Sequence, residues 1–227
     1  ALPIYKQLAL EAQSQNLDLS SLLKTAPRSS ISLKAAVQAD LNKQRVNTFN
    51  YNIAPGSQFA NAPLSGEGSL SLDLEKLSAQ AVMAHLLIAG NRLDAQGAWG
   101  RPGDQLKLKL QAPNLARLGL GVSGVLNVDA NIEGEAQAPA GRFEFKADDL
   151  KMPSGWQLQH AKGQGNLALV PQAPFALNVE LQGLNAPAPA SPLNLSKANI
   201  QLAGTRSAHQ LKLSLAQTQG NALQSVL

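Results

Sequence analysis

The chain has 227 residues, of which 15% are charged; its net charge is +4 and it has no cysteine. The length is sufficient for one large or two small domains with a substantial core, and the absence of cysteine excludes disulfides, thiolate metal sites and cysteine nucleophiles. The basic excess is small and spread along the sequence, so we expect a solvated surface and no nucleic-acid partner. No apolar run reaches the roughly 18 residues of a membrane helix. No signal peptide is visible and the pattern stops abruptly at the last residues, so we expect a piece of a longer protein.

Alternation of apolar and polar residues predicts β-strands along most of the chain. In the stretch QLKLKLQ at 105–111, the leucines would spread over roughly 200° of a helix, whereas on a strand they all point to one face. This period outweighs the intrinsic helix propensity of Leu and Ala. In chain order, the alternation occurs at Ile31/Leu33/Ala35/Val37, Leu70/Leu72/Leu74, Leu106/Leu108/Leu110, Leu126/Val128/Ala130/Ile132, Phe143/Phe145/Ala147, Phe175/Leu177/Val179/Leu181 and Leu211/Leu213/Leu215.

Glycine and proline clusters such as LSGEGS, RPGD and NAPAPASP separate the expected strands. We therefore predict ten or more strands, an all-β fold, and almost no helix. A single helical turn is expected within NLDLSSLLK at 16–24 and another within NLARLG at 114–119.

Three similar segments indicate an internal repeat. QLALEA begins at Gln7, QLKLKL at Gln105 and QLKLSL at Gln210, so the starts lie 98 and 105 residues apart. We predict that residues 1–227 form one continuous segment of a longer array, with repeats at 7–104 and 105–209 and a truncated copy at 210–227. Neighbouring repeats of this kind cover each other's edges in an elongated structure.

The stretch GLGVSG at 119–124 has the glycine spacing of a dinucleotide-binding motif. That motif requires a preceding strand and a helix that opens at the last glycine, where the helix N-terminus holds the phosphates. Here Gly124 is followed at once by VLNVDANIEG, which alternates like a strand. We therefore interpret the glycines as a tight turn between strands and expect no nucleotide and no other cofactor.

No group of residues has the spacing of a catalytic or metal site. His85, His160 and His209 are isolated, with no second ligand two or four residues away. Asp148 and Asp149 are adjacent and are expected in a solvated loop. We therefore predict neither a metal site nor an enzyme.

Spaced motifs between residues 87 and 150 lie at Gly90, Asn91, Leu93, Gly97 and Gly100, then at Leu115, Leu118, Gly124 and Leu126, then at Gly134 and Pro139. Gly204, Thr205 and His209 form a further motif. In this order the motifs, each degenerate by itself, resemble the TamB family, the inner-membrane subunit of the translocation and assembly module, within the wider AsmA-like group of bacterial envelope proteins. The likeness covers most of the chain. The N-terminal third departs most, since its TAPRSS connector lacks the family's glycine.

This resemblance implies a long, curled, antiparallel or mixed β-sheet, open along one side like a folded taco, with an apolar inner groove. It also implies a periplasmic location in a Gram-negative bacterium, as part of a protein anchored in the inner membrane. Proteins of this family are associated with phospholipid movement between membranes and with outer-membrane protein assembly beside a barrel partner of the TamA type. The membrane anchor and the region facing that partner are expected outside this segment.

The residues point to the same arrangement, because a curled sheet places every second residue inside. An aliphatic lining offers apolar area to phospholipid acyl chains without directional contacts. The expected groove-lining residues are Leu33, Leu70, Leu72, Leu74, Leu106, Leu108, Leu110, Leu126, Val128, Phe143, Phe145, Leu177, Val179, Leu211, Leu213 and Leu215.

Two other functions remain open at this point. In the first, the segment is a scaffold or chaperone whose sheet edges template strands of unfolded outer-membrane proteins. In the second, it is a passenger β-solenoid with a fully packed core that binds no ligand.

Overall fold

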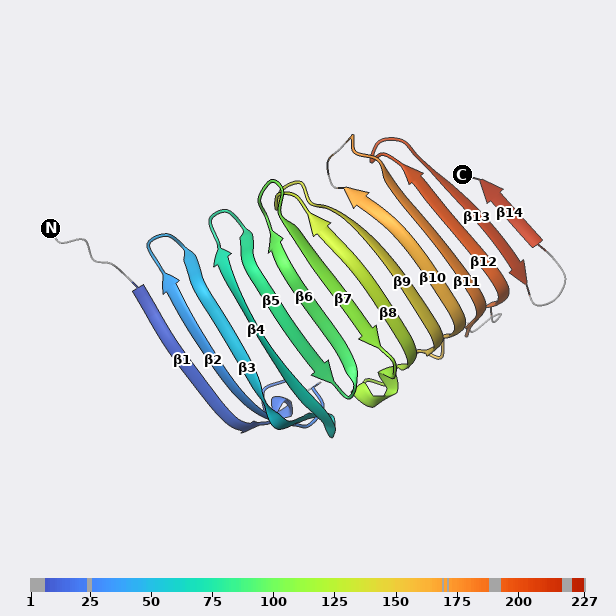
Figure 1. The fold of residues 1–227 in the computed structure, drawn as a ribbon. Coiled ribbons are helices and arrows are strands. Elements are labelled where there is room, and N and C mark those ends of the chain that lie inside the picture. The colour runs from blue at the N-terminus through green and yellow to red at the C-terminus, as the bar shows by residue number, and fades with distance from the viewer. Residues whose placement is uncertain are drawn as a thin grey trace. The chain divides into compact units, whose positions relative to one another are not determined.

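The computed structural model describes residues 7–23, 26–168, 170, 172–187, 193–217 and 222–226, and this part of the chain is all-β (Figure 1). The predicted fold class is confirmed. The chain divides into two compact units, one made of Ala1–Lys109 with Ile132–Gln137 and the other of Leu110–Asn131 with Ala138–Leu227.

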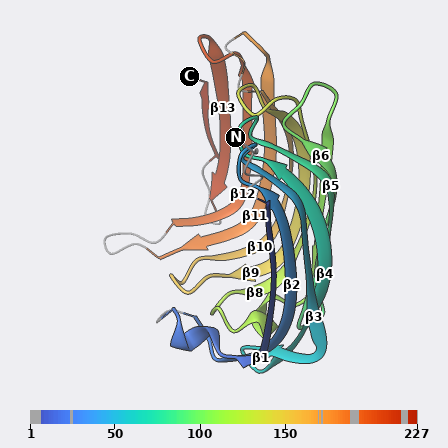
Figure 2. The ribbon, with the colours of Figure 1, turned by 90° about the vertical axis from the view of Figure 1, so that its left-hand side faces the viewer.

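In the first unit, six strands pair in chain order, each antiparallel to the next. These strands bend along their length, as β1 to β4 show in Figure 2. Every pair contains at least one register shift, and such bulges increase the local bend and twist of a strand. The strands are β1 Gln7–Leu17, β2 Ser29–Asp40, β3 Arg45–Phe59, β4 Ala62–Asp73, β5 Ser78–Ile88 and β6 Asn91–Trp99.

In the second unit, the strands from β9 onward also pair antiparallel in chain order. Among these pairs, only β12 with β13 has a register shift. Two further strands, β7 and β8, each contain residues of both units. The strands are β7 Gln105–Ala112, β8 Ser123–Glu133, β9 Ala140–Lys151, β10 Gln157–Ala168, β11 Phe175–Ala186, β12 Leu193–Gly204, β13 His209–Gln217 and β14 Ala222–Val226.

The two predicted helical turns are present as short 3₁₀ helices, η1 Leu19–Ser21 and η2 Leu115–Leu118. The Asp18 carboxylate anchors η1, since its Oδ1 accepts hydrogen bonds from the backbone N–H of Ser20 at 3.0 Å and of Ser29 at 2.9 Å. The hydrogen bond from Ser29 is the main reason that the pKa of Asp18 is lowered from its ordinary value. No helix in the described ranges is long and apolar enough to cross a membrane.

The residues of the seven predicted alternations lie on strands, except for Leu74 after the end of β4. That strand ends at Asp73, and Leu74 lies in the following turn, where its N–H donates to the carbonyl of Gln44 at 2.9 Å. The alternation of apolar and polar residues in the sequence continues into this turn, but the strand does not. Asp148 and Asp149 lie inside β9, so the prediction that they occupy a loop was wrong.

Candidate apolar binding face

The strands of the second unit bring apolar residues into continuous rows across the sheet. Residues directly opposite each other in an antiparallel pair point to the same face, so the register fixes which side chains are neighbours. Each row contains only aliphatic residues, phenylalanine or glycine. From β9 to β13 the rows are Phe143–Gly165–Leu177–Leu202–Leu211, Phe145–Gly163–Val179–Ile200–Leu213 and Ala147–Ala161–Leu181–Ala198–Leu215.

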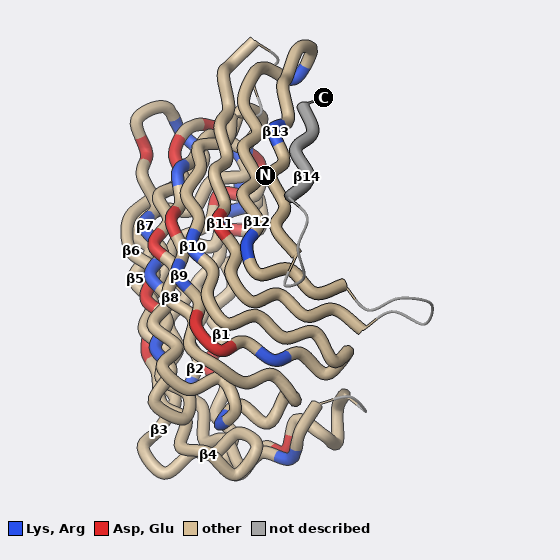
Figure 3. The backbone as a smooth tube through the Cα atoms, turned by 90° about the vertical axis from the view of Figure 1, so that its right-hand side faces the viewer, with Lys and Arg blue, Asp and Glu red and all other residues tan. Residues whose placement is uncertain are grey.

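The opposite face of the same sheet is polar. Its rows alternate with the apolar rows, as a pleated strand requires. Charged positions recur along these strands, separated by uncharged stretches (Figure 3). The polar rows are Glu144–Gln164–Asn178–Gln201–Lys212 and Lys146–Lys162–Glu180–Asn199–Ser214, and Lys162 and Glu180 form an ion pair at 3.1 Å.

The first unit repeats this division in spite of its bulges. Its polar rows include Gln13–Lys34–Asn52–Glu67–His85–Asp94. We call the apolar side of each sheet the apolar face of that unit. In the first unit the apolar rows are Leu10–Val37–Phe49–Leu70, Leu8–Ala39–Val46–Leu72–Ala79–Trp99, Ala12–Ala35–Tyr51–Gly68–Ala84–Ala95 and Ser14–Leu33–Ile53–Gly66–Leu86–Leu93.

The apolar faces are only half-buried. No large side chain of the described residues is fully buried, and Leu10 on β1 is 54% exposed. Leu177, Val179 and Leu213 have intermediate exposure, although each has paired residues on both sides. Part of each side chain is therefore accessible, which leaves apolar area available to a bound molecule.

The register places ten of the predicted lining residues on these faces: Leu33, Leu70 and Leu72 in the first unit, and Phe143, Phe145, Leu177, Val179, Leu211, Leu213 and Leu215 in the second. On β7, Leu106, Leu108 and Leu110 are half-buried while the intervening residues are exposed. Leu126 and Val128 on β8 are also half-buried. Leu74, in its turn, is 53% exposed and belongs to neither set of rows.

Several residues on the apolar faces were not predicted from the sequence. Phe49 and Tyr51 on β3, and Ile200 and Leu202 on β12, lie on the apolar faces and were not predicted. Both pairs alternate with polar residues in the sequence, as FNYNI at 49–53 and as ANIQLAG at 198–204, so the signal was available. On β3 the alternation is short, because register shifts lie on either side of it.

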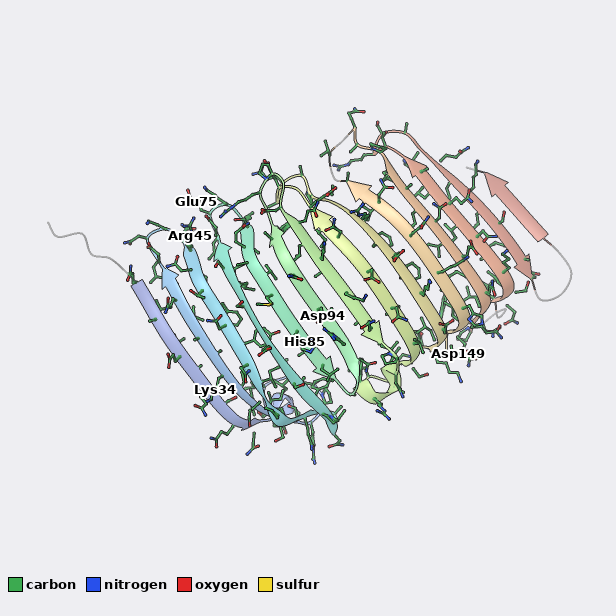
Figure 4. All side chains as sticks on the ribbon, in the orientation of Figure 1. Lys34, Arg45, Glu75, His85, Asp94 and Asp149 are labelled. Carbon is green, nitrogen blue, oxygen red and sulfur yellow. The ribbon has the colours of Figure 1, made fainter. Side chains whose placement is uncertain are left out.

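Two histidines on the polar faces have carboxylate partners on neighbouring strands. His85 Nδ1 lies 2.6 Å from Asp94 Oδ1, and Arg92 Nε donates to the other oxygen of Asp94 at 2.6 Å (Figure 4). The hydrogen bond from Arg92 is the main reason that the pKa of Asp94 is lowered. In the second unit, His160 Nδ1 lies 2.7 Å from Asp148 Oδ1.

These histidine pairs depend on cross-strand register, so spacing along one strand could not reveal them. Each consists of one imidazole and one carboxylate, which is fewer ligands than a metal site needs. Across the residues that the structure describes, no three His, Cys, Asp or Glu side chains are grouped to hold a metal ion.

The glycine stretch at 119–124 is a turn followed by a strand. Gly119 ends η2 in a left-handed conformation with φ of 69°, and β8 begins at Ser123. Gly124 has φ of 114°, and a Cβ added there would lie 2.6 Å from the carbonyl oxygen of Asp149. The glycine therefore permits β8 to approach β9 closely, and no helix follows it that could hold a phosphate.

Comparison with known proteins gives one match. A search of curated proteins and a search of solved structures each found no match. A family model described as "TamB, N-terminal domain" matches residues 6–226, including the N-terminal third in which the sequence motifs were weakest. Because this match spans nearly all of the 227 residues, the chain belongs to the TamB family.

Proposed function

We propose that this chain is a segment of an intermembrane lipid conduit whose apolar faces shield phospholipid acyl chains from water in the bacterial periplasm. The main supporting observation is the continuity of the apolar rows. From β9 to β13 they contain no polar side chain, while every intervening row on the other face is polar. The alanines of one row are buried, but the large side chains of all three rows are only half-buried. This supports a bound apolar ligand, because an uncovered apolar face is costly in water.

The chemistry of the face matches an acyl chain better than a polar ligand. Each methylene group removed from water contributes about 0.8 kcal/mol, so a long chain faces a large barrier if it crosses water unshielded. An aliphatic face lowers that barrier along its whole length. Because it offers no directional contact, it creates no single deep binding site that would hold the lipid in place.

Membership of the TamB family supports the proposed location and partners. The family consists of bacterial envelope proteins, and a TamA-type barrel is the partner expected for the family in general. In this proposal the chain acts in the periplasm by binding and guiding lipid and performs no catalysis. Contacts with the barrel and the inner-membrane anchor are assigned to regions outside this segment.

The direct test is photocrosslinking in cells from a photoreactive amino acid at Leu108, with Lys107 as the matched outward control. The two positions are adjacent on β7, where Leu108 is half-buried and Lys107 exposed. A phospholipid adduct at position 108 alone, identified by mass spectrometry, is the expected result. No lipid adduct at 108, or equal adducts at both positions, would overturn the proposal.

A charge on the apolar face should block lipid movement. We expect Leu213→Asp to lower lipid adduct formation at position 108 by at least about tenfold, because a carboxylate among Ile200 and its neighbours must be solvated. Lys212→Asp, on the exposed side of β13, should leave the adduct unchanged. Equal effects of the two variants would contradict the assignment of the faces.

The alternative is a scaffold that templates strands of outer-membrane proteins through its edge backbone. A proline that weakens pairing at the edge strand β1 would then reduce assembly of those proteins more than Leu213→Asp does. Protein adducts without lipid at position 108 would favour this alternative.

A further inference from the structure

Two strands, one in each unit, have the pattern Gly-x-Gly on the apolar face. On β4, Gly66 and Gly68 precede Leu70 and Leu72 in the sequence GEGSLSL. On β10, Gly163 and Gly165 begin the similar sequence GQGNLAL, in which each glycine lies 97 residues after its counterpart. Each of these glycines occupies an apolar row. The neighbours in the row are Ile53 and Leu86 for Gly66, Tyr51 and Ala84 for Gly68, Phe145 and Val179 for Gly163, and Phe143 and Leu177 for Gly165.

In the first unit, the ring of Tyr51 covers one of these glycines. A Cβ added to Gly68 would lie 2.9 Å from the Tyr51 Cζ atom. The Tyr51 hydroxyl lies 3.4 Å from the carbonyl oxygen of His85, which belongs to β5. The side chain therefore starts on β3 and extends across β4 to β5, lying along the sheet. Burial raises the pKa of the Tyr51 hydroxyl, consistent with a phenol held against the face.

In the second unit, two phenylalanine rings of β9 cover both glycines of β10. A Cβ added to Gly163 would lie 2.8 Å from Phe145 Cζ, and one added to Gly165 would lie 3.1 Å from Phe143 Cζ. Both rings therefore lean over the neighbouring strand and occupy the volume in which a β-carbon would otherwise stand.

The backbone does not require glycine at these positions. Gly66, Gly68, Gly163 and Gly165 are absent from the left-handed region of φ, in contrast to Gly124. What these positions exclude is a side chain, because a β-carbon would displace the ring or approach a backbone carbonyl. At these positions a ring lies over bare backbone, whereas the other residues of the rows carry side chains of their own.

We propose that these ring-covered glycines are seats for an alkyl chain of the bound lipid. The ring seats are defined as Tyr51 with Gly68 in the first unit, and Phe143 with Gly165 and Phe145 with Gly163 in the second. This inference rests on the proposed function and adds a statement about specificity: the low relief of the seats sets the cross-section of chain that the face accepts.

The chemistry of a ring seat fits a linear hydrocarbon. The ring lies over the glycine backbone, so the chain meets ring carbon where the glycine itself presents no side chain. A flat ring also contacts a straight chain along several methylene groups at once, which a single branched side chain does not do. A headgroup finds no charged partner in these rows.

The test compares Gly163→Val with Gln164→Val in the 227-residue chain. Of the two glycines on β10, Gly163 is the better one to substitute, because its added Cβ would be closer to the Phe145 ring than to any backbone atom. The nearest backbone atom, the carbonyl oxygen of Asn178, would lie 3.1 Å away. Gln164 is the next residue, exposed on the polar face, and receives the same substitution. The probe is a phosphatidylethanolamine with a photoreactive diazirine in one acyl chain, and the readout is its adduct yield with each variant.

We expect Gly163→Val to lower the adduct yield by roughly tenfold, the change produced by a loss of about 1.4 kcal/mol, and Gln164→Val to leave it unchanged. Phe145→Leu, which removes the ring but keeps apolar volume, should also lower the yield. Thermal unfolding of each variant identifies loss of folding, and Gly163→Ala replaces Gly163→Val if the latter does not fold.

Ring and glycine on adjacent strands also stabilise a sheet, and this role must be separated from ligand binding. If Phe145→Leu lowers the melting temperature but wild-type, Gly163→Val and Phe145→Leu chains give equal adduct yields, the ring seats are structural only and the inference is overturned. In that case adducts with the wild-type chain would still support the proposed function. Absence of adducts with the wild-type chain would overturn the proposed function itself.

Discussion

The two units build similar apolar faces from ladders of different regularity. In the second unit, β9 to β12 pair without a register shift, and alternation places the three apolar rows on one side. In the first unit, Val46 and Phe49 lie three residues apart on β3 but face Leu72 and Leu70, which lie two apart on β4. Without the bulge between them, Val46 and Phe49 would point to opposite faces.

Bulges in the first unit therefore maintain the apolar face where the sequence loses its alternation. The same correction occurs on β5, where Ala79 and Val82 lie three residues apart but face Trp99 and Gly97, which lie two apart. Ala81, between them, has φ of 50°, the left-handed conformation of a bulged residue. Both units therefore have apolar rows across their strands. The second unit maintains them by regular alternation, and the first unit by bulges.

The strongest test of this comparison is deletion of one residue from each kind of strand. Deletion of Asn47 removes the extra residue of the β3 bulge and leaves the residues on either side with the parity of a regular ladder. We expect a change of no more than about 1 kcal/mol in the free energy of unfolding. Deletion of Glu144 makes Phe143 and Phe145 adjacent on a strand without a register shift. All residues of β9 on one side of the deletion must then point to the opposite face of the sheet.

For the Glu144 deletion we expect a loss of roughly 3–5 kcal/mol, or failure to fold. Denaturant unfolding followed by circular dichroism measures both variants. Equal losses in the two deletions would show that the bulge on β3 has a role beyond restoring parity.

The difference between the units also explains which parts of the fold the sequence could predict. The alternating apolar residues of β7, β9, β11 and β13 were predicted correctly, although β9 continues through Asp148 and Asp149, which were expected in a loop. Strands β3 and β5 were not assigned an alternation. Each alternates only over a short stretch, FNYNI at 49–53 and VMAHLLI at 82–88, because bulges limit how far the pattern extends. Leu74 was misplaced because alternation in sequence does not mark where pairing stops and the turn begins.

The cross-strand contacts could not be predicted at all from one sequence. The pairing of His85 with Asp94 and the cover of Gly68 by Tyr51 join different strands, so both depend on register. The division into a repeat of about a hundred residues remains a prediction. The two GxGxLxL segments, 97 residues apart on β4 and β10, are consistent with it.

A second test asks whether the regular unit tolerates small changes in its backbone. Gly124 at the start of β8 combines φ of 114° with carbonyl oxygens of Asp148 and Asp149 within 2.7 Å of an added Cβ. We expect Gly124→Ala to cost about 2–3 kcal/mol, from backbone strain together with this clash. Gly103 has φ of 82° but open space around it, so Gly103→Ala should cost only about 1 kcal/mol. Equal losses of stability for the two variants in thermal unfolding would mean that backbone strain alone, without the clash, determines the cost.

A third test concerns the ion pair between β3 and β4 in the first unit. The Asp73 side chain is 5% exposed; its Oδ2 accepts a hydrogen bond from Arg45 Nη2 at 2.8 Å and its Oδ1 accepts one from the N–H of Lys76 at 3.0 Å. The hydrogen bond from Arg45, followed by that from Lys76, lowers the pKa of Asp73. We expect Asp73→Asn to lower the melting temperature at neutral pH by roughly a few degrees.

The pH dependence of this effect follows from the direction of the shift. Because the pKa of Asp73 is lower in the folded protein, its contribution to stability is complete above the unfolded pKa, near 4, and is lost as the pH falls through the folded pKa. The difference in melting temperature between wild type and Asp73→Asn should therefore shrink below about pH 4. A difference that stays constant down to pH 2 would refute the assignment of the effect to this carboxylate.

The smallest effect is expected for the exposed pair of the second unit. The side chains of His160 and Asp148 are 59% and 51% exposed, so water and salt screen their interaction, and both groups remain solvated if it is lost. We expect Asp148→Asn to change the free energy of unfolding by less than about 0.5 kcal/mol in denaturant titrations. The backbone of Asp148, whose carbonyl lies against Gly124, is unchanged in this variant. A loss larger than that of Asp73→Asn would mean that the polar face of the second unit contributes to stability through its charges. Its regular ladder would then depend on cross-strand ion pairs as well as on the apolar rows beneath them.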